Sequence, residues 1–141
     1  RVGINGRLDT LQAAILLAKF AIFAEEVDLR QQVARNYGEL LSRFVTVPAI
    51  PGGYRSAWAQ YSVLARDGAE RTALMAKLRS GSVPTAVYYP KPLHLQRAFA
   101  YLAYREGSFP ASEDCARRIF SLPMHPYLAV EEQRRIAGLF P

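Results

Sequence analysis

Residues 3–17 read Gly3-Ile4-Asn5-Gly6-Arg7-Leu8-Asp9-Thr10-Leu11-Gln12-Ala13-Ala14-Ile15-Leu16-Leu17, a glycine-bracketed polar turn that leads directly into an apolar run. Apolar residues recur there at spacings of three, four and seven, which is typical of a helix with an apolar face. Ala14, Leu17 and Phe20 make most of the remaining helix surface apolar as well. Such a helix needs more covering protein than one neighbour supplies, so we expect it at the centre of a large fold or in an interface.

The chain has 141 residues, of which 50% are hydrophobic and 21% are charged, a composition typical of one globular domain with its own core. It begins with Arg1-Val2, without an initiator Met, and the polar turn follows almost at once. We therefore expect it to be a piece of a longer polypeptide.

Neither a membrane nor a nucleic acid is an expected partner. The longest apolar run, from Leu11 to Phe23, is broken by Gln12 and Lys19 and is shorter than the roughly 20 residues of a membrane span. The net charge is +6, but the basic residues are scattered, with no basic run or helix-turn-helix spacing. Diffuse positive charge of this kind is typical of a surface that keeps a protein soluble, or of one that attracts a small polyanionic ligand.

The single cysteine, Cys115, excludes an internal disulfide and offers no metal-ligand cluster. This usage fits a reducing compartment, and we expect a cytoplasmic protein. Cys115 stands at apolar helical spacing from Ile119, which predicts a buried thiol without chemical function. A redox or nucleophilic role is the alternative.

The first third of the chain is predicted to be helical. Asn5 or Asp9 can cap the first helix, which we expect to end near Phe23. Acidic residues from Glu25 onward then predict the first turn of a second, amphipathic helix, whose apolar stripe is Leu29, Val33, Tyr37, Leu40, Leu41 and Phe44. A Pro- and Gly-rich stretch over 48–53 ends it, so we divide the chain into a helical segment (1–46) and a small domain (47–141).

The small domain is predicted to mix strands with helices. Strands are expected over 57–65 and 85–89, with a short extended segment over 121–124. Helices are expected over 70–80, 112–120 and 130–139, the first of them stopped by Gly81 in the left-handed conformation. The pattern predicts an α+β fold, with an antiparallel sheet and helices on one face.

Two polar stretches suit ligand binding. Asn5-Gly6-Arg7 stands at a helix N-terminus, where free N–H groups, an amide and a guanidinium could receive a phosphate, although spacing alone favours a simple cap. Tyr88-Tyr89-Pro90-Lys91-Pro92-Leu93-His94-Leu95-Gln96 combines a strand end with a proline-stiffened loop, and its phenols and imidazole suit sugar hydroxyls or phosphates. The alternative for this loop is sheet-edge packing by the tyrosines and a loop hydrogen bond from His94. A third stretch, residues 121–127, is predicted to be structural, with His125 orienting backbone.

Several of these stretches together resemble the carboxy-terminal part of the DegT family of nucleotide-sugar aminotransferases. The resemblance is carried, in matching order and spacing, by residues 5–16, by Trp58-Ala59-Gln60-Tyr61, by residues 83–96 and by residues 122–128. It covers nearly the whole chain and is nearest to members that aminate a keto group on a UDP-linked acetamido sugar in lipopolysaccharide O-antigen assembly.

The resemblance implies a pyridoxal-phosphate enzyme of aspartate-aminotransferase fold (fold type I), of which this chain would be the small domain preceded by long interface helices. It implies a homodimer that moves an amino group, commonly from glutamate, to a keto nucleotide-sugar. The residue matching Asn5 reaches the cofactor phosphate across the dimer, and the one matching Arg7 lies near the nucleotide-sugar phosphates. The pair matching Tyr88 and Tyr89 approaches the substrate from the neighbouring subunit.

The chain departs from this pattern in two respects. In the nearest members the residue matching Tyr88 is usually His, so Tyr88 keeps a donor but loses a group that can be charged near neutral pH. The lysine, acid and aromatic ring that hold the cofactor in the family would lie upstream of Arg1, and none of Lys19, Lys77 and Lys91 matches that lysine. We therefore expect the chain alone to be inactive; the alternative is a non-catalytic module that binds a nucleotide-sugar or dimerises.

Overall fold

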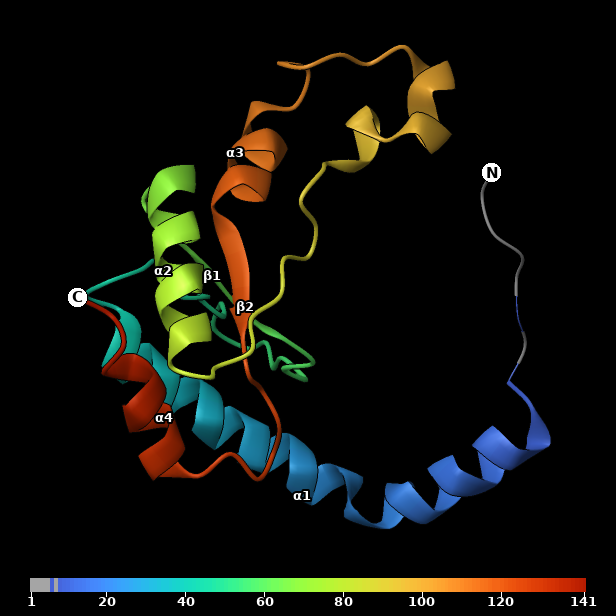
Figure 1. Ribbon diagram of the computed structural model, residues 1–141. Coiled ribbons are helices and arrows are strands. Elements are labelled where there is room, and N and C mark those ends of the chain that lie inside the picture. The colour runs from blue at the N-terminus through green and yellow to red at the C-terminus, as the bar shows by residue number, and fades with distance from the viewer. Residues whose placement is uncertain (1–5, 7) are drawn as a thin grey trace.

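The computed structural model describes residue 6 and residues 8–141. In chain order its elements are α1 (Thr10–Leu41), β1 (Tyr61–Leu64), α2 (Gly68–Ser80), the 3-10 helices η1 (Leu93–Leu95) and η2 (Arg97–Leu102), α3 (Pro110–Arg118), β2 (Ile119–Leu122) and α4 (Val130–Ala137). Two parts project from the body of the molecule toward the same side: the N-terminal half of α1, and the segment that carries η1 and η2 (Figure 1). The predicted α+β class is confirmed.

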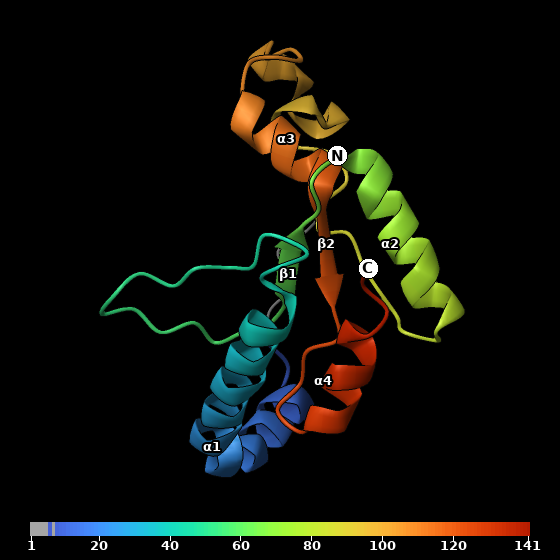
Figure 2. The same cartoon turned by 90° about the vertical axis from the view of Figure 1, so that its left-hand side faces the viewer.

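The sheet consists of β1 and β2, paired antiparallel with Tyr61 opposite Leu122 and Val63 opposite Phe120. These four side chains are buried and belong to one hydrophobic cluster with residues of α1, α2 and α4. On the opposite face, the hydroxyl oxygens of Ser62 and Ser121 lie 2.8 Å apart and share a hydrogen bond. Viewed from the side, α2 stands beside β2, and α4 lies next to the C-terminal half of α1 (Figure 2).

The prediction of two helices in the first third is wrong, because α1 is one continuous helix of 32 residues. No glycine or proline interrupts residues 10–37, and Glu25 and Glu26 are themselves good helix formers. Of the two predicted caps, Asp9 is confirmed: its carboxylate accepts the Gln12 N–H at 2.9 Å.

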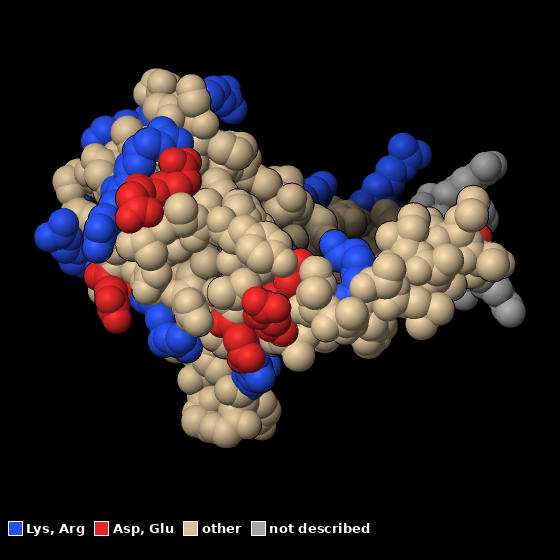
Figure 3. All heavy atoms as spheres, turned by 90° about the horizontal axis from the view of Figure 1, so that it is seen from below, with Lys and Arg blue, Asp and Glu red and all other residues tan. Residues whose placement is uncertain are grey.

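The two halves of α1 have opposite environments. Val33, Ala34, Tyr37 and Leu41 are buried in the cluster that continues into the rest of the molecule, across the proposed boundary at residue 46, so the division into two domains stays a prediction. The N-terminal half and Leu8 just before it instead expose large apolar side chains, which in the helix are Leu11, Ile15, Leu16, Leu17, Phe20, Ile22 and Phe23. Viewed from below, this half shows mostly uncharged side chains, whereas acidic and basic residues gather over the body (Figure 3). No helix among the described residues is long and apolar enough to cross a bilayer.

The segment predicted as a strand over 85–89 pairs with β2 at one residue only. Ala86 exchanges two backbone hydrogen bonds with Ser121, and the chain then leaves the sheet. Pro84 and Pro90 bracket the segment and lack the N–H groups that a longer ladder would need. Residues 119–120, predicted to end a helix, begin β2 instead.

Gly81 does not end α2 in the left-handed conformation, since its φ is −84°. Ser82 takes that conformation, with φ at 57°. The Ser82 N–H bonds the Arg79 carbonyl and the Val83 N–H bonds the Leu78 carbonyl, which is the Schellman pattern with Ser82 just past the cap. Gly81 instead packs against Leu139: a Cβ at position 81 would lie 2.5 Å from Leu139 Cδ1, so the Leu139 side chain would have to move.

We expect Ser82→Gly to raise the free energy of unfolding by about 0.5–1 kcal/mol, because glycine adopts the left-handed conformation without a Cβ penalty. Ser80→Gly, two residues earlier and inside α2, is the matched control and should lower it by about 0.5 kcal/mol through lost helix propensity. Urea titration of both variants measures the two signs. Destabilisation by Ser82→Gly would contradict the assigned end of α2.

Candidate functional site

Tyr88 and Tyr89 lie where the chain leaves the sheet after Ala86. Their side chains are exposed by 42% and 69%, and their rings meet edge to face with centroids 6.0 Å apart. Neither phenol is buried in the hydrophobic cluster, which argues against packing as their main task. Tyr89, the more exposed of the two, therefore does not pack at the sheet edge.

Two hollows flank Tyr88. The first, which we call the arm cavity, has a volume of about 210 Å3 and lies between the loop of residues 88–96 and α3. It is lined by Tyr88, Tyr89, Lys91, Pro92, Leu93, Gln96, Ser112, Cys115, Ala116 and Ile119. The sheet cavity, of about 270 Å3, is lined by Ala59, Gln60, Pro84, Thr85, Ala86, Tyr88, Ser121, Leu122, Pro123 and Met124. The fold thus brings three separate sequence stretches together around Tyr88.

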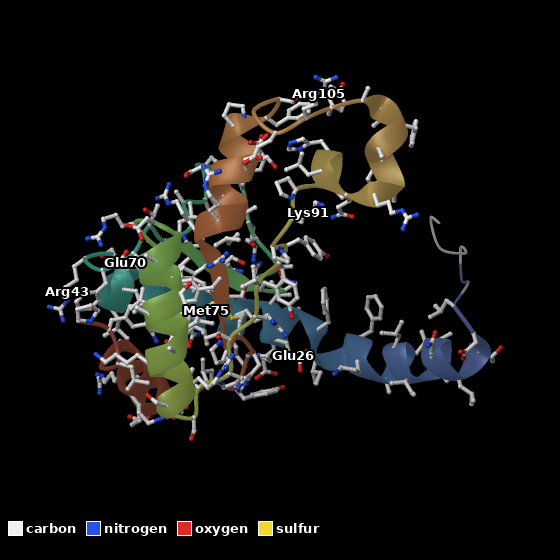
Figure 4. The ribbon with its side chains drawn as sticks, turned by 45° about the horizontal axis from the view of Figure 1, so that its top comes forward. Glu26, Arg43, Glu70, Met75, Lys91 and Arg105 are labelled. Atoms are coloured by element: carbon white, nitrogen blue, oxygen red, sulfur yellow. The ribbon has the colours of Figure 1, made fainter. Side chains whose placement is uncertain are left out.

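The arm cavity offers donors of several kinds. Its lining includes Tyr88, Tyr89, Lys91 and Gln96, whose side chains carry hydrogen-bond donors, and the 3-10 helices continue outward from there. Lys91 lies where the loop enters the projecting segment, and Arg105 lies where the chain returns toward α3 (Figure 4). This donor set suits an anionic or hydroxyl-rich ligand such as a phosphate ester or a sugar.

We call residues 93–109 the arm; it is tied to α3 by Glu113, a residue that the sequence patterns did not single out. The Glu113 carboxylate accepts the Gly107 N–H at 2.9 and 3.0 Å and the Phe109 N–H at 3.2 Å. His94 Nε2 lies 2.9 Å from Glu113 Oε1, so the predicted loop hydrogen bond of His94 is present. Proline at 110 and an acid in the first turn of α3 are the sequence signals that could have pointed to Glu113.

The hydrogen bond from the Gly107 N–H is the main reason that the pKa of Glu113 lies below its usual range, with those from Phe109 and His94 adding to it. The carboxylate is therefore ionised at neutral pH and can only accept hydrogen bonds. It follows that His94 Nε2 carries a proton and donates to Glu113.

The predicted cofactor residue Asn5 and the predicted phosphate residue Arg7 lie outside the described residues. The structure therefore does not test their roles. Lys19, Lys77 and Lys91 are exposed and lie on α1, on α2 and in the loop before the arm.

Cys115 is exposed, so the prediction of a buried thiol is wrong. It lies on α3, whose buried positions are Glu113 and Ala116, and it lines the arm cavity. The apolar spacing to Ile119 misled the prediction because the helix ends at Arg118 and Ile119 belongs to β2.

In the folded chain we expect the Cys115 thiol to react with Ellman's reagent within about tenfold of its rate in urea, since accessibility limits thiol reactivity. Ala116→Cys on a Cys115→Ser background is the matched control, because Ala116 is 8% exposed and its thiol should react far more slowly. A Cys115 that reacts only after denaturation would contradict the exposed position.

Comparison with known proteins places this geometry in a family. The model of the DegT/DnrJ/EryC1/StrS aminotransferase family matches residues 1–140. The chain belongs to this family.

Individual relatives agree. A UDP-2-acetamido-2-deoxy-3-oxo-D-glucuronate aminotransferase from Pseudomonas aeruginosa is 46% identical over 129 residues, which are 91% of this chain and 34% of the relative. A UDP-N-acetyl-3-dehydro-alpha-D-glucosamine 3-aminotransferase from Acidithiobacillus ferrooxidans is 40% identical over 96% of this chain and 36% of its own length. The chain thus spans about a third of the length of these curated relatives.

A solved structure confirms the fold. The crystal structure of a DegT DnrJ EryC1 StrS aminotransferase from Brucella abortus superposes with a TM-score of 0.87 at 48% identity, covering 99% of this chain and 36% of that one. The small α+β fold of this chain is therefore that of one part of a family aminotransferase.

Proposed function

We propose that this chain is the carboxy-terminal part of a pyridoxal-phosphate-dependent aminotransferase that transfers an amino group, from glutamate, to a keto group on a UDP-linked sugar in O-antigen or related polysaccharide assembly. The observation that carries the proposal is the 46% identity to an aminotransferase named for a UDP-linked 3-oxo sugar acid, within a family match over residues 1–140. A cytoplasmic location fits enzymes that use such soluble substrates.

A homodimer is part of the proposal. Leu11, Leu17 and Phe20 on the projecting half of α1 are exposed by 79%, 73% and 68%. Apolar surface of this extent is unfavourable in water and calls for a partner or for further protein of the same polypeptide. We propose that a second subunit and the rest of the longer chain together cover this apolar surface.

The substrate is proposed to meet the chain at the loop around Tyr88 and Tyr89. Tyr88, Tyr89 and Lys91 line one cavity, and we propose that their hydroxyls and ammonium hold the diphosphate and sugar hydroxyls of a nucleotide-sugar and orient its keto group. Arg7 is proposed to contact the same phosphates, and Asn5 the phosphate of the cofactor. Tyr88, where the nearest family members usually have His, can donate a hydrogen bond and carries no positive charge.

The described residues do not fit a complete cofactor site. A complete site needs a lysine that forms the Schiff base, an acid paired with the pyridinium nitrogen and an aromatic ring over the cofactor. The chain's three lysines are exposed and lie on α1, on α2 and in the loop before the arm. When bound, this cofactor supplies the electron sink for amino-group exchange. We propose that the residues anchoring it belong to the remainder of the longer polypeptide, and that this chain contributes substrate orientation and water exclusion.

The full-length protein with pyridoxal phosphate should show a cofactor absorbance band at the short-wavelength edge of the visible spectrum. It should also transfer the amino group of glutamate to a UDP-linked 3-keto sugar. The 141-residue chain with the same cofactor should do neither, because it lacks the matching lysine. Borohydride treatment followed by mass spectrometry decides the point. A cofactor fixed covalently to the 141-residue chain would overturn the proposal.

Titration calorimetry of the chain with UDP and UDP-N-acetylglucosamine tests the alternative of a stand-alone binding module. A half-site should bind weakly or not at all, whereas a dedicated module should bind both nucleotides with a measurable heat. Tight binding by the chain, together with a full-length protein that fails to transaminate, would favour the module.

Two variants of the full-length protein should separate the roles of the two stretches. Asn5→Ala should weaken cofactor retention during dialysis and leave the small domain folded. Tyr89→Phe should retain cofactor and raise the KM for the nucleotide-sugar about fivefold, the equivalent of one hydrogen bond of about 1 kcal/mol. Unchanged retention in the first variant, or unchanged KM in the second, would count against the assigned residue.

A further inference from the structure

The contact between Glu113 and His94 is more deeply buried than the ion pairs among the described residues. Their side chains are 7% and 8% exposed, whereas each of the other pairs has a member that is at least 39% exposed. A buried carboxylate costs free energy unless its oxygens are fully bonded, and here two backbone N–H groups and one imidazole bond them. Such a fully bonded group at the base of a projecting segment calls for an explanation.

The contacts close the arm at both of its ends. His94 lies at the beginning of the arm, Gly107 and Phe109 lie at its end, and Glu113 joins them from α3. The His94 ring also packs on the Phe109 ring, with centroids 4.8 Å apart, and Phe109 packs on Tyr104 at 4.9 Å. We call His94, Phe109 and Glu113 the clamp.

The clamp joins two walls of the arm cavity. One wall comes from the loop and the start of the arm, with Tyr89, Lys91 and Gln96. The other wall comes from α3, with Ser112 and Cys115 on either side of Glu113 in sequence. The separation of the walls therefore depends on the contacts that hold the arm to α3.

We propose that Glu113 and His94 are positioning residues, which hold the arm on α3 and so keep the walls of the arm cavity at the spacing that a nucleotide-sugar requires. The proposal rests on the proposed function for the identity of the ligand. The clamp acts through Tyr89, Lys91 and Gln96, and neither Glu113 nor His94 lines the cavity itself.

The charge of Glu113 matters because every partner of its carboxylate is a donor. In Glu113→Gln, an amide NH2 replaces one oxygen and faces the Gly107 N–H, so one contact becomes a donor facing a donor. Glu113→Ala removes all of the contacts. Asp114→Asn is the matched control: it changes the same charge on the next residue of α3, which pairs with Arg118 and takes no part in the clamp.

The experiment uses the full-length protein with cofactor and a UDP-linked 3-keto sugar. Hydrogen exchange of residues 93–109 should become about tenfold faster in Glu113→Ala, less so in Glu113→Gln, and unchanged in Asp114→Asn. The KM for the nucleotide-sugar should rise about tenfold in Glu113→Ala, whereas kcat and the half-reaction with glutamate should change less than twofold. If Glu113→Ala fails to fold, Glu113→Gln and His94→Ala carry the same comparison.

Arm exchange that stays unchanged in the Glu113 variants would overturn the clamp. Faster hydrogen exchange of the arm with an unchanged KM for the nucleotide-sugar would overturn the positioning role. So would a half-reaction with glutamate that is impaired as much as the reaction with the nucleotide-sugar. A wild-type protein that transfers no amino group would overturn the proposed function and the nucleotide-sugar role together, and the exchange of the arm would still decide the clamp.

Discussion

The contact of Tyr37 with Tyr61 joins the long helix to the sheet, and the remaining architecture depends on it. Tyr37 is fully buried, its ring centroid lies 5.0 Å from that of Tyr61, and its hydroxyl donates to the Pro123 carbonyl at 3.1 Å. Burial raises the pKa of Tyr37 well above its usual range and that of Tyr61 to about 12, as expected for phenols surrounded by apolar side chains. A hydroxyl in such surroundings needs a partner, and Pro123, 86 residues away in sequence, supplies it.

This joint places the candidate site relative to α1. Near Tyr37 on the same helix, Gln31 accepts the Trp58 indole N–H at 2.9 Å, and Arg30 donates to the Trp58 carbonyl at 2.8 Å. The residues before β1 are thereby fixed on α1, β1 fixes β2, and Ser121 of β2 holds Ala86. Tyr88 is two residues further along the chain. The tyrosines of the site are thus connected to α1 through a short series of backbone and buried side-chain contacts.

The sequence predicted best what local patterns determine. The cap at Asp9, the apolar stripe around Tyr37, a strand within 57–65 and the helices before Gly81 and after Ala129 follow from side-chain spacing and capping within a few residues. The strand itself is shorter than predicted, covering Tyr61–Leu64. The errors lie where distant contacts decide. Leu139, 58 residues away, packs on Gly81, and the left-handed residue at the end of α2 is its neighbour Ser82. Residues 85–89 pair with β2 at one position, Ala86 with Ser121, which the alternation of the segment does not reveal.

Of the candidate site, the sequence predicted the tyrosines, whose role stays a prediction, whereas the contacts of the clamp do not follow from any sequence pattern. Neither η1 nor η2 contributes a buried residue, so hydrophobic burial does little to hold the arm in place. Hydrogen bonds to one carboxylate must supply much of what an apolar core supplies elsewhere, and the donors come from Gly107, Phe109 and His94, which share no sequence period. A segment held in this way keeps its shape without a core of its own and leaves its outer side chains free to contact a ligand or a second chain. Tyr101 in the arm is 77% exposed, and the arm projects toward the same side of the molecule as the N-terminal half of α1 (Figure 1).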